Sequence, residues 1–259
     1  MIMQLVDTHC HLESSLYRGQ LDGIIAGAKK AGIRALITSS IEPGQWEQSL
    51  SLSEKYDIVH CSLGIHPWYI REQDIPALDS LKDMARRRGA VAIGEIGLDS
   101  NIDRPDFNLQ RRVFEQQLAI AKEIDIPVII HCRGAFNELL VAIKRTGLPE
   151  RGGTVHSFSG SAEIAEELMK YGLSFSLGGI LTYRNSRKRE KMMGVIYPDH
   201  FLLETDSPDI PPVEAKGSLH VPANILYNLK AAAEILCRPE EEVARQTTKN
   251  AARIFNLSL

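Results

Sequence analysis

The amino-acid sequence predicts an α/β protein, a (β/α)8 TIM barrel in a single domain that covers residues 1–259. Short β-branched runs alternate with longer amphipathic segments along the whole chain. Eight such runs start between residues 4 and 201, about 28 residues apart, which is typical of repeated βα units. No linker, low-complexity segment or sequence repeat indicates a second domain.

The predicted strands are short apolar runs bounded by polar or turn-forming residues. In chain order they cover residues 4–9, 35–40, 59–66, 91–96, 127–131, 154–158, 174–177 and 201–205. Eight strands that are each followed by a crossover segment favour a closed parallel barrel. A doubly wound open sheet is the alternative, but it usually carries a phosphate-binding glycine motif, and neither G-x-G-x-x-G nor G-x-x-x-x-G-K-[ST] occurs here.

Amphipathic segments lie between the strands, most clearly at residues 21–31, 107–123 and 162–171. A glycine follows several helical segments, at the position where a helix commonly ends: Gly32, Gly89, Gly147 and Gly172. The region 223–255 predicts two further helices, the first after Pro222 and the second near Pro239. These segments supply the outer layer that a parallel barrel requires.

The composition excludes several classes of protein. With 44% hydrophobic and 24% charged residues the chain is typical of a soluble globular protein, and its net charge of −3 provides no strong basic field. No apolar run reaches the roughly 18 residues of a membrane span, and no secretory leader is evident. The four cysteines are widely spaced, without a CxxC pair, so we expect reduced thiols and a cytoplasmic location.

Polar side chains gather where the predicted strands stop. In a parallel barrel these ends form the catalytic face. The residues concerned are His9 and His11 after the first strand, His66 after the third, Glu95 after the fourth, His131 and Arg133 after the fifth, His156 after the sixth, and Glu204 and Asp206 after the eighth. His9 and His11 are two residues apart, so both imidazoles point to one face, and Cys10 points to the other.

Imidazoles and carboxylates in this arrangement predict a site for two divalent metal ions. We expect His9, His11 and Asp206 to hold one ion, His131 and His156 to hold the other, and Glu95 to bridge the two. A water between the ions would act as the nucleophile, with Asp206 accepting its proton. These ligands suit Zn²⁺, Mn²⁺ or Fe²⁺, and suit Mg²⁺ less well.

Other residues at the C-terminal ends of the predicted strands indicate which kind of substrate binds. Arg133 shares a strand face with His131, and arginine binds phosphate or carboxylate in a bidentate manner. His66 is expected to bind substrate. The alternatives are a salt bridge at the barrel rim for Arg133 and packing beneath a turn for His66. Glu204 either orients a ligand or pairs with a base at the rim. We expect His60 and His200 to be structural or exposed, and the sequence assigns no role to His220.

These motifs together resemble the TatD family of metal-dependent hydrolases, within the amidohydrolase-like barrels. The resemblance rests on Asp7-Thr8-His9-Cys10-His11, Gly64-Ile65-His66-Pro67, Gly94-Glu95-Ile96-Gly97-Leu98-Asp99, His131-Cys132-Arg133, His156-Ser157-Phe158-Ser159-Gly160 and Glu204-Thr205-Asp206-Ser207-Pro208. It implies a barrel with a metal pair on the six ligands above and a cytoplasmic deoxyribonuclease activity. Gly134, Ser100 and the loop after Pro208 depart from the family pattern, and these loops shape substrate binding.

Three hypotheses for the function follow. The leading one is a phosphodiesterase that acts on DNA as a 3′–5′ exonuclease, with Glu95 and Asp206 as catalytic residues. The second is a hydrolase of a small phosphoester, amide or lactone substrate at the same metal site. The third is a binding or scaffold protein with a vestigial site. We expect DNA or a small phosphoester as the partner, with no membrane contact and no obligate protein partner.

Overall fold

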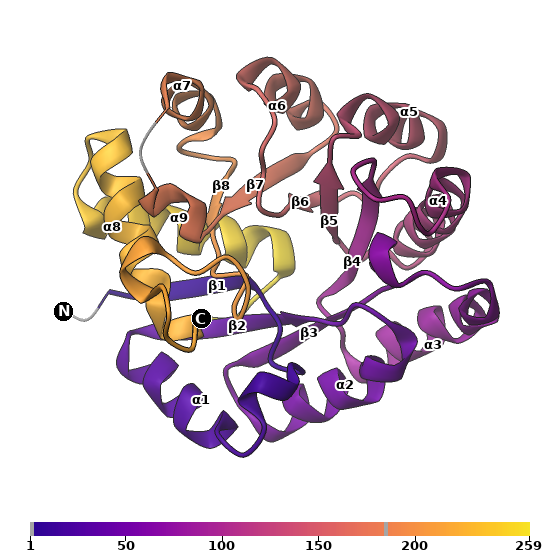
Figure 1. Cartoon of the computed structure of the whole chain (residues 1–259), viewed down its shortest axis with the longest axis horizontal. Helices are drawn as coiled ribbons and strands as arrows, with labels where there is room; N and C mark the ends of the chain where they lie inside the picture. Colours follow the sequence, from indigo (N-terminus) through magenta and orange to yellow (C-terminus); the bar gives the residue numbers. More distant parts are fainter. Residues whose placement is uncertain (1–2, 184–185) are drawn as a thin grey trace.

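Eight parallel strands form one sheet in which each strand pairs with the next along the chain, and the sheet curls into a nearly closed barrel (Figure 1). The computed structural model describes residues 3–183 and 186–259. The strands are β1 Leu5–Cys10, β2 Ile33–Ser39, β3 Val59–Leu63, β4 Ala92–Asp99, β5 Val128–Arg133, β6 Gly153–Val155, β7 Leu173–Leu177 and β8 Phe201–Leu203. The predicted fold class is therefore confirmed.

Helices lie around the outside of the ring of strands (Figure 1). They are α1 Leu21–Lys30, α2 Trp46–Lys55, α3 Leu78–Arg88, α4 Phe107–Ile124, α5 Phe136–Thr146, α6 Ala162–Met169, α7 Arg187–Ile196 and α8 Ile225–Leu236. The last helix is α9 Glu240–Phe255. The three amphipathic segments and the two C-terminal helices all form within two residues of their predicted ends. In the described part of the chain, no helix combines the length and the apolar character that crossing a membrane requires.

Several strand ends differ from the sequence prediction by two or three residues. Strand β3 ends at Leu63 rather than at 66, whereas β4 continues past 96 because its pairing with β5 extends to Asp99 and Arg133. Strands β6 and β8 stop after three residues each, short of the predicted 158 and 205. Beyond them Ser157 and Asp206 adopt positive φ angles of 44° and 57°, which turn the backbone out of the strand conformation.

The apolar core has two layers. A large outer cluster fills the space between strands and helices, and a smaller inner cluster lies inside the barrel. The inner cluster combines strand residues with the end of α9: Val6, Ala35, Ile37, Ala92, Ile129, Leu202, Ala251, Ile254, Phe255 and Leu257. Thr248 on α9 also donates a hydrogen bond to the carbonyl of Gln4, just before β1. Helix α9 therefore closes the N-terminal end of the barrel, and polar residues are left to the opposite end.

The first and last strands meet at a seam that polar groups hold together. The Thr8 hydroxyl donates to the carbonyl of Leu203 over 2.9 Å, and the Thr205 N–H donates to the buried carboxylate of Asp7 over 2.9 Å. Two backbone bonds follow, from the Asp206 N–H to the His9 carbonyl and from the His11 N–H to the Ser207 carbonyl, both 2.8 Å. The seam fixes Asp206 beside the two histidines that follow from β1.

Candidate metal centre

A cavity of about 1170 Å³ opens at the C-terminal end of the strands. Its walls include most of the residues that the sequence predicts for the site: His11, His66, Glu95, His131, Arg133, His156 and Asp206. Because the other end of the barrel is closed by α9, this cavity is where polar side chains from different strands converge.

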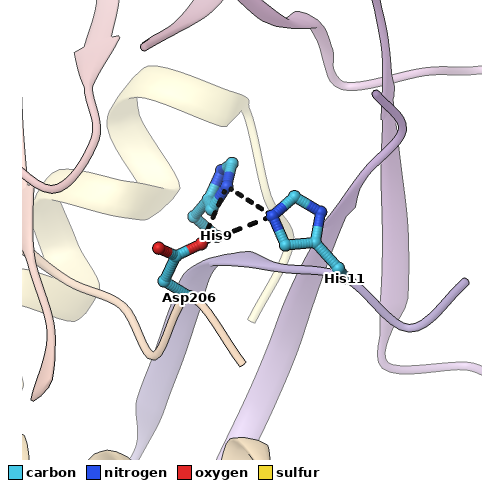
Figure 2. Close-up of side chains that lie close together, drawn as sticks. All are labelled: His9, His11 and Asp206. Carbon is cyan, nitrogen blue, oxygen red and sulfur yellow. Dashed lines mark hydrogen bonds and ion pairs between the residues drawn. The ribbon is translucent and has the colours of Figure 1, made fainter. Parts of the chain in front are cut away.

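His9, His11 and Asp206 form one side of the centre (Figure 2). Asp206 Oδ1 lies 3.5 Å from His9 Nε2 and 3.3 Å from His11 Nε2, and the two Nε2 atoms are 3.3 Å apart. Ser39 contacts both remaining ring nitrogens: its hydroxyl is 3.1 Å from His9 Nδ1, and its carbonyl is 2.8 Å from His11 Nδ1. The two imidazoles are thus oriented so that both Nε2 atoms face Asp206.

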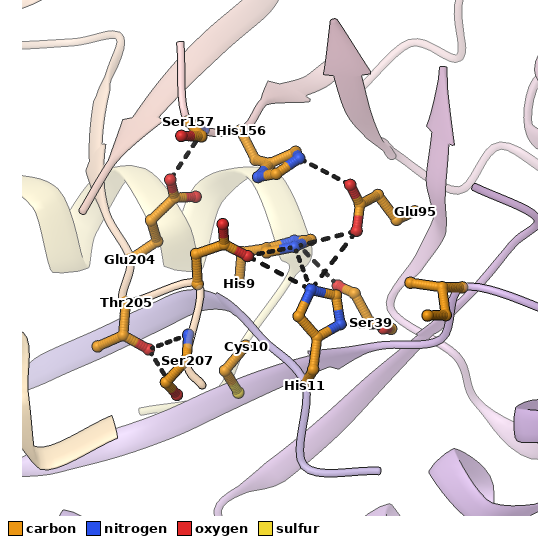
Figure 3. A network of polar contacts seen from close by, with 12 residues as sticks. His9, Cys10, His11, Ser39, Glu95, His156, Ser157, Glu204, Thr205 and Ser207 are labelled. Carbon is orange, nitrogen blue, oxygen red and sulfur yellow. Dashed lines mark hydrogen bonds and ion pairs between the residues drawn. The ribbon is translucent and has the colours of Figure 1, made fainter. Parts of the chain in front are cut away.

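Glu95 lies between this group and His156 (Figure 3), and His131 is on the same side as His156. Its Oε2 atom is 3.2 Å from His9 Nε2 and 3.6 Å from His11 Nε2. Its Oε1 atom is 2.8 Å from His156 Nε2 and 3.4 Å from His131 Nδ1. One carboxylate oxygen therefore faces each pair of histidines, as a bridging position requires.

His66 joins the second side of the centre, where the sequence placed only His131 and His156. Its Nε2 atom lies 3.1 Å from Glu95 Oε1, and its ring is in an edge contact with His131 at 4.4 Å between centroids. The side chain is buried, and its Nδ1 atom accepts a hydrogen bond from the Trp68 N–H. The structure thus places His66 among the possible ligands as well as on the cavity wall.

Asp99 supports the centre from behind, and the sequence reasoning gave it no role. Its fully buried carboxylate lies 3.1 Å from His131 Nε2 and 3.0 Å from Arg133 Nε, and it accepts a hydrogen bond of 2.6 Å from the Trp68 indole. Burial opposes its ionisation, but the His131 and Trp68 hydrogen bonds hold the pKa of Asp99 well below its usual range. A carboxylate at the end of the strand beside His131 was the signal available in the sequence.

Glu204 and His220 lie behind the centre on the β8 side. Glu204 accepts hydrogen bonds from the Ser157 N–H, at 2.8 Å, and from the Ser176 hydroxyl, so it holds the turn that follows His156 (Figure 3). Burial raises the pKa of Glu204 to about 7. His220 is buried, with Nε2 3.1 Å from the Thr205 carbonyl. Both residues therefore hold the backbone around the candidate ligands.

Of the remaining residues that the sequence analysis named, Arg133 lies at the cavity, and His60 and His200 lie outside its lining. Arg133 lines the cavity and is also paired with Asp99, so the predicted rim salt bridge and the substrate-facing position coexist. His200 sits at the start of β8, with Nδ1 3.1 Å from the Leu173 carbonyl, away from the cavity lining. His60 lies on β3 and is likewise outside that lining.

The histidines around Glu95 differ from one another in their pKa values. Burial lowers the pKa of His9 to about 4, so this imidazole is neutral at pH 7. Burial also disfavours charge on His11 and His156, but Asp206 and Glu95 raise the pKa of His11 to about 10, and Glu95 raises that of His156 to about 9. Burial opposes ionisation of Glu95 as well, yet the facing histidines hold its pKa well below the usual range. The carboxylate is charged and surrounded by imidazole nitrogens.

The donor set fits divalent cations. Three overlapping groups each bring their ligand atoms within 4.8 Å of one another, and they are His9–His11–Asp206, His9–Glu95–His156 and His66–Glu95–His131. The Nδ1 atom of His156 is buried and has no hydrogen-bond partner among the described residues. Imidazole nitrogen together with carboxylate oxygen is the ligand chemistry of Zn²⁺, Mn²⁺ and Fe²⁺ sites.

Comparison with known proteins identifies relatives across the whole chain. The model of the family described as TatD related DNase matches residues 6–256. The metal-dependent hydrolase YabD of Bacillus subtilis is 33% identical over 254 residues, which cover 98% of this chain and 100% of YabD. The putative deoxyribonuclease tatdn3 of Danio rerio is 30% identical and covers 99% of this chain and 98% of its own length.

A solved structure agrees with this sequence relationship. The crystal structure of YjjV, a TatD homologue from Escherichia coli K12, superposes with a TM-score of 0.92 at 32% identity and covers 100% of both chains. A hydrolase of the same family from Entamoeba histolytica shares the fold, with a TM-score of 0.83 at 20% identity. The likeness therefore extends from the motifs around the cavity to the complete barrel.

Proposed function

This chain belongs to the TatD family of metal-dependent hydrolases, and from that premise we propose that it hydrolyses phosphodiester bonds in DNA from the 3′ end. The observation that carries the proposal is the position of Glu95 between two groups of histidines, one at each carboxylate oxygen. Two ions held close together by a shared carboxylate form the arrangement used for in-line displacement at phosphorus.

The proposal assigns the ligands residue by residue. His9, His11, Asp206 and Glu95 would hold one divalent ion, and His131, His156 and Glu95 would hold the other. When bound, such ions lower the pKa of water and withdraw charge from phosphoryl oxygens. Glu95 and the neutral His9 are already in the protonation states that ligation requires.

Asp206 is the proposed proton acceptor. Its carboxylate is buried at the cavity wall, and the hydrogen bond from His11 together with the nearby His156 and His9 keeps its pKa below the usual value despite burial. It is therefore ionised at neutral pH and can take a proton on its carboxylate. Glu204 keeps the turn after His156 in place during this step.

The size of the cavity favours an extended substrate over a small one. Its volume of about 1170 Å³ exceeds the roughly 300–1,000 Å³ of most small-molecule sites. The cationic side chains of Arg133, Lys188 and Arg189 line it together with the carboxylates of Glu13, Glu42 and Asp209, and the three cations are the groups that would pair with phosphate. The four free thiols fit a reducing compartment, so the proposal places the enzyme in the cytoplasm.

A nuclease assay tests the proposal directly. Protein loaded with Zn²⁺ or Mn²⁺ should shorten a 5′-labelled single-stranded oligonucleotide from its 3′ end. The Glu95→Gln and Asp206→Asn variants should lose at least about 100-fold in rate, which is the scale of losing one metal or proton contact. Glu214→Gln, an exposed change away from the cavity lining, is the matched control.

A substrate panel separates this function from its rivals. Bis(p-nitrophenyl) phosphate, p-nitrophenyl phosphate, a lactone and an amide are compared with the oligonucleotide by kcat/KM. A higher kcat/KM for a small ester, lactone or amide than for DNA would overturn the proposal. Cleavage of DNA that survives in both Glu95→Gln and Asp206→Asn would show that a contaminating nuclease is responsible.

A further inference from the structure

An exposed tryptophan stands at the rim of the cavity, beside the candidate metal centre. Trp68 follows His66 in the turn after β3, and 45% of its surface is exposed. The other tryptophan, Trp46, is 2% exposed and packs in the core. Burial of apolar area therefore accounts for Trp46 but leaves the exposed ring of Trp68 unexplained.

The Trp68 ring is held in a fixed orientation. Its indole N–H donates to Asp99 over 2.6 Å, and its backbone N–H donates to His66 Nδ1 over 3.1 Å. The ring meets His131 edge-on, with 5.9 Å between centroids. The same carboxylate that orients His131 thus fixes the tryptophan, and a ligand on the indole loses little entropy to ordering the side chain.

A cation lies next to this ring. The guanidinium carbon of Arg133 is 5.3 Å from the Trp68 ring centroid, and Arg133 Nε is paired with Asp99. Arg133 lines the cavity, and within the described residues its hydrogen bonds and ion pairs involve Nε alone, so its two Nη groups are left for a ligand. The guanidinium therefore covers one face of the indole, and the opposite face is the one left to a ligand beside this phosphate-binding fork.

We propose that Trp68 is a stacking platform for a nucleobase, with Arg133 binding the phosphate attached to that nucleotide. This subsite rests on the proposed function, because it requires a nucleic-acid strand whose end reaches the metal centre. Every base has an aromatic face, so a stacking platform accepts all four bases and requires the base to be unpaired. Trp68 then acts on substrate affinity, while the centre carries out the hydrolysis.

Abasic substrates test the platform separately from the chemistry. Oligonucleotides with one tetrahydrofuran abasic residue at each of the last three 3′ positions are compared with the intact strand. At one of these positions the wild-type KM should rise roughly 5- to 150-fold, the range for loss of one stacked base. Trp68→Ala should raise KM for the intact strand by a similar factor and leave KM for that abasic strand nearly unchanged.

Two variants and an optical signal complete the design. Trp68→Phe keeps an aromatic face and should recover most of the affinity, and Tyr227→Ala removes a comparably exposed aromatic outside the cavity and should change nothing. Binding of a phosphorothioate-protected strand should quench tryptophan fluorescence in the wild type but not in Trp68→Ala. Trp46 is buried, so the exposed Trp68 supplies this response.

The outcomes distinguish the two proposals. If the wild type degrades DNA but Trp68→Ala raises KM equally for intact and abasic strands, the platform is overturned and the nuclease function stands. If DNA is not cleaved yet the intact strand quenches Trp68 while the abasic strand does not, the nuclease function is overturned and the platform stands. If neither cleavage nor quenching occurs, both are overturned.

Discussion

Two buried carboxylates, Glu95 and Asp99, each contact several residues of the candidate metal centre. Glu95 reaches histidines from β1 with one oxygen and histidines from β5 and the turn after β6 with the other. Asp99 similarly connects His131 with Trp68 and Arg133. A buried carboxylate with several donors around it fixes the rotamers of all its partners, so the loss of either group disturbs more than one contact.

Asp99→Asn tests the supporting carboxylate. The amide presents an N–H group where the His131, Trp68 and Arg133 donors need an acceptor, so His131 loses its orientation. We expect a 10- to 100-fold loss of metal affinity or activity, the usual effect of removing such a partner. Isothermal titration with Zn²⁺ measures it, and exposed Asp103→Asn is the matched control. Equal affinities in the two variants would contradict this role for Asp99.

The thiols provide a second prediction at this scale. Cys10, Cys61 and Cys132 are buried and Cys237 is exposed. Burial raises the pKa of Cys61 to about 11 and that of Cys132 to about 12, so both stay protonated at pH 8, where the thiolate is the reactive form. The folded protein should show one thiol that reacts rapidly with DTNB at pH 8, and four in denaturant. Cys237→Ser should abolish the rapid phase, and a rapid phase that persists would refute the assignment.

At the scale of elements, two strands change the face that they turn inward just before a candidate ligand. In β1, Val6 belongs to the inner core and Cys10 to the outer core, although strict alternation would put both on one side. The pairing of β1 with β2 shifts register between Asp7 and Cys10. A similar shift between Ile93 and Ile96 of β4 surrounds Glu95. These irregularities direct His9 and Glu95 into the cavity.

These shifts mark the limit of what the sequence predicts. In β5 the alternation is regular: Ile129 is in the inner core, so His131 and Arg133 follow on that face, as the sequence indicated. The spacing of His9 and His11 likewise predicts that they share a face. Alternation cannot predict which face β1 or β4 turns inward after a register shift, because the shift depends on the neighbouring strand. The positions of His66 and Asp99 relative to Glu95 depend on the same tertiary packing.

Gly97 shows how closely β4 and β5 approach beside the site. Its φ angle is +150°, and a Cβ atom there would lie 1.9 Å from the His131 carbonyl oxygen. Gly97→Ala should therefore lower the free energy of unfolding by at least about 2 kcal/mol through overpacking and backbone strain. Urea denaturation measures this change.

Gly194 in α7 is the matched control for that substitution. A Cβ atom there meets nothing within 4 Å, and alanine is favoured over glycine inside a helix. Gly194→Ala should stabilise the protein by about 0.5–1 kcal/mol. A similar loss of stability in both variants would show that the effect at Gly97 does not arise from the strand approach.

At the scale of the whole molecule, the apolar residues that close the barrel and the polar residues of the candidate metal centre lie at opposite ends. Helix α9 fills the N-terminal end with apolar side chains, and the C-terminal end gathers imidazoles and carboxylates around the cavity. The two ends lie on opposite sides of the inner core. Exposed loops at the cavity end can therefore vary without loss of the apolar closure at the other end.

Metal binding should stabilise the complete barrel, because the ligands come from several strands. After removal of metal with EDTA, Zn²⁺ or Mn²⁺ at about 100 times Kd should add about 2.7 kcal/mol. For a chain of this size that corresponds to a rise in Tm of roughly 5–10 °C. Differential scanning calorimetry measures the rise, which should be retained in Glu214→Gln. A rise of equal size in Glu95→Gln would argue against binding at this centre.

The seam between β1 and β8 has a consequence for synthesis of the protein. His9 and His11 are made first, but Asp206, which faces them, is separated from them by almost the full length of the chain. A nascent chain that has not yet docked β8 carries the two imidazoles without their carboxylate partner. We therefore expect tight metal capture at this group only once the last strand has docked and the ring is closed.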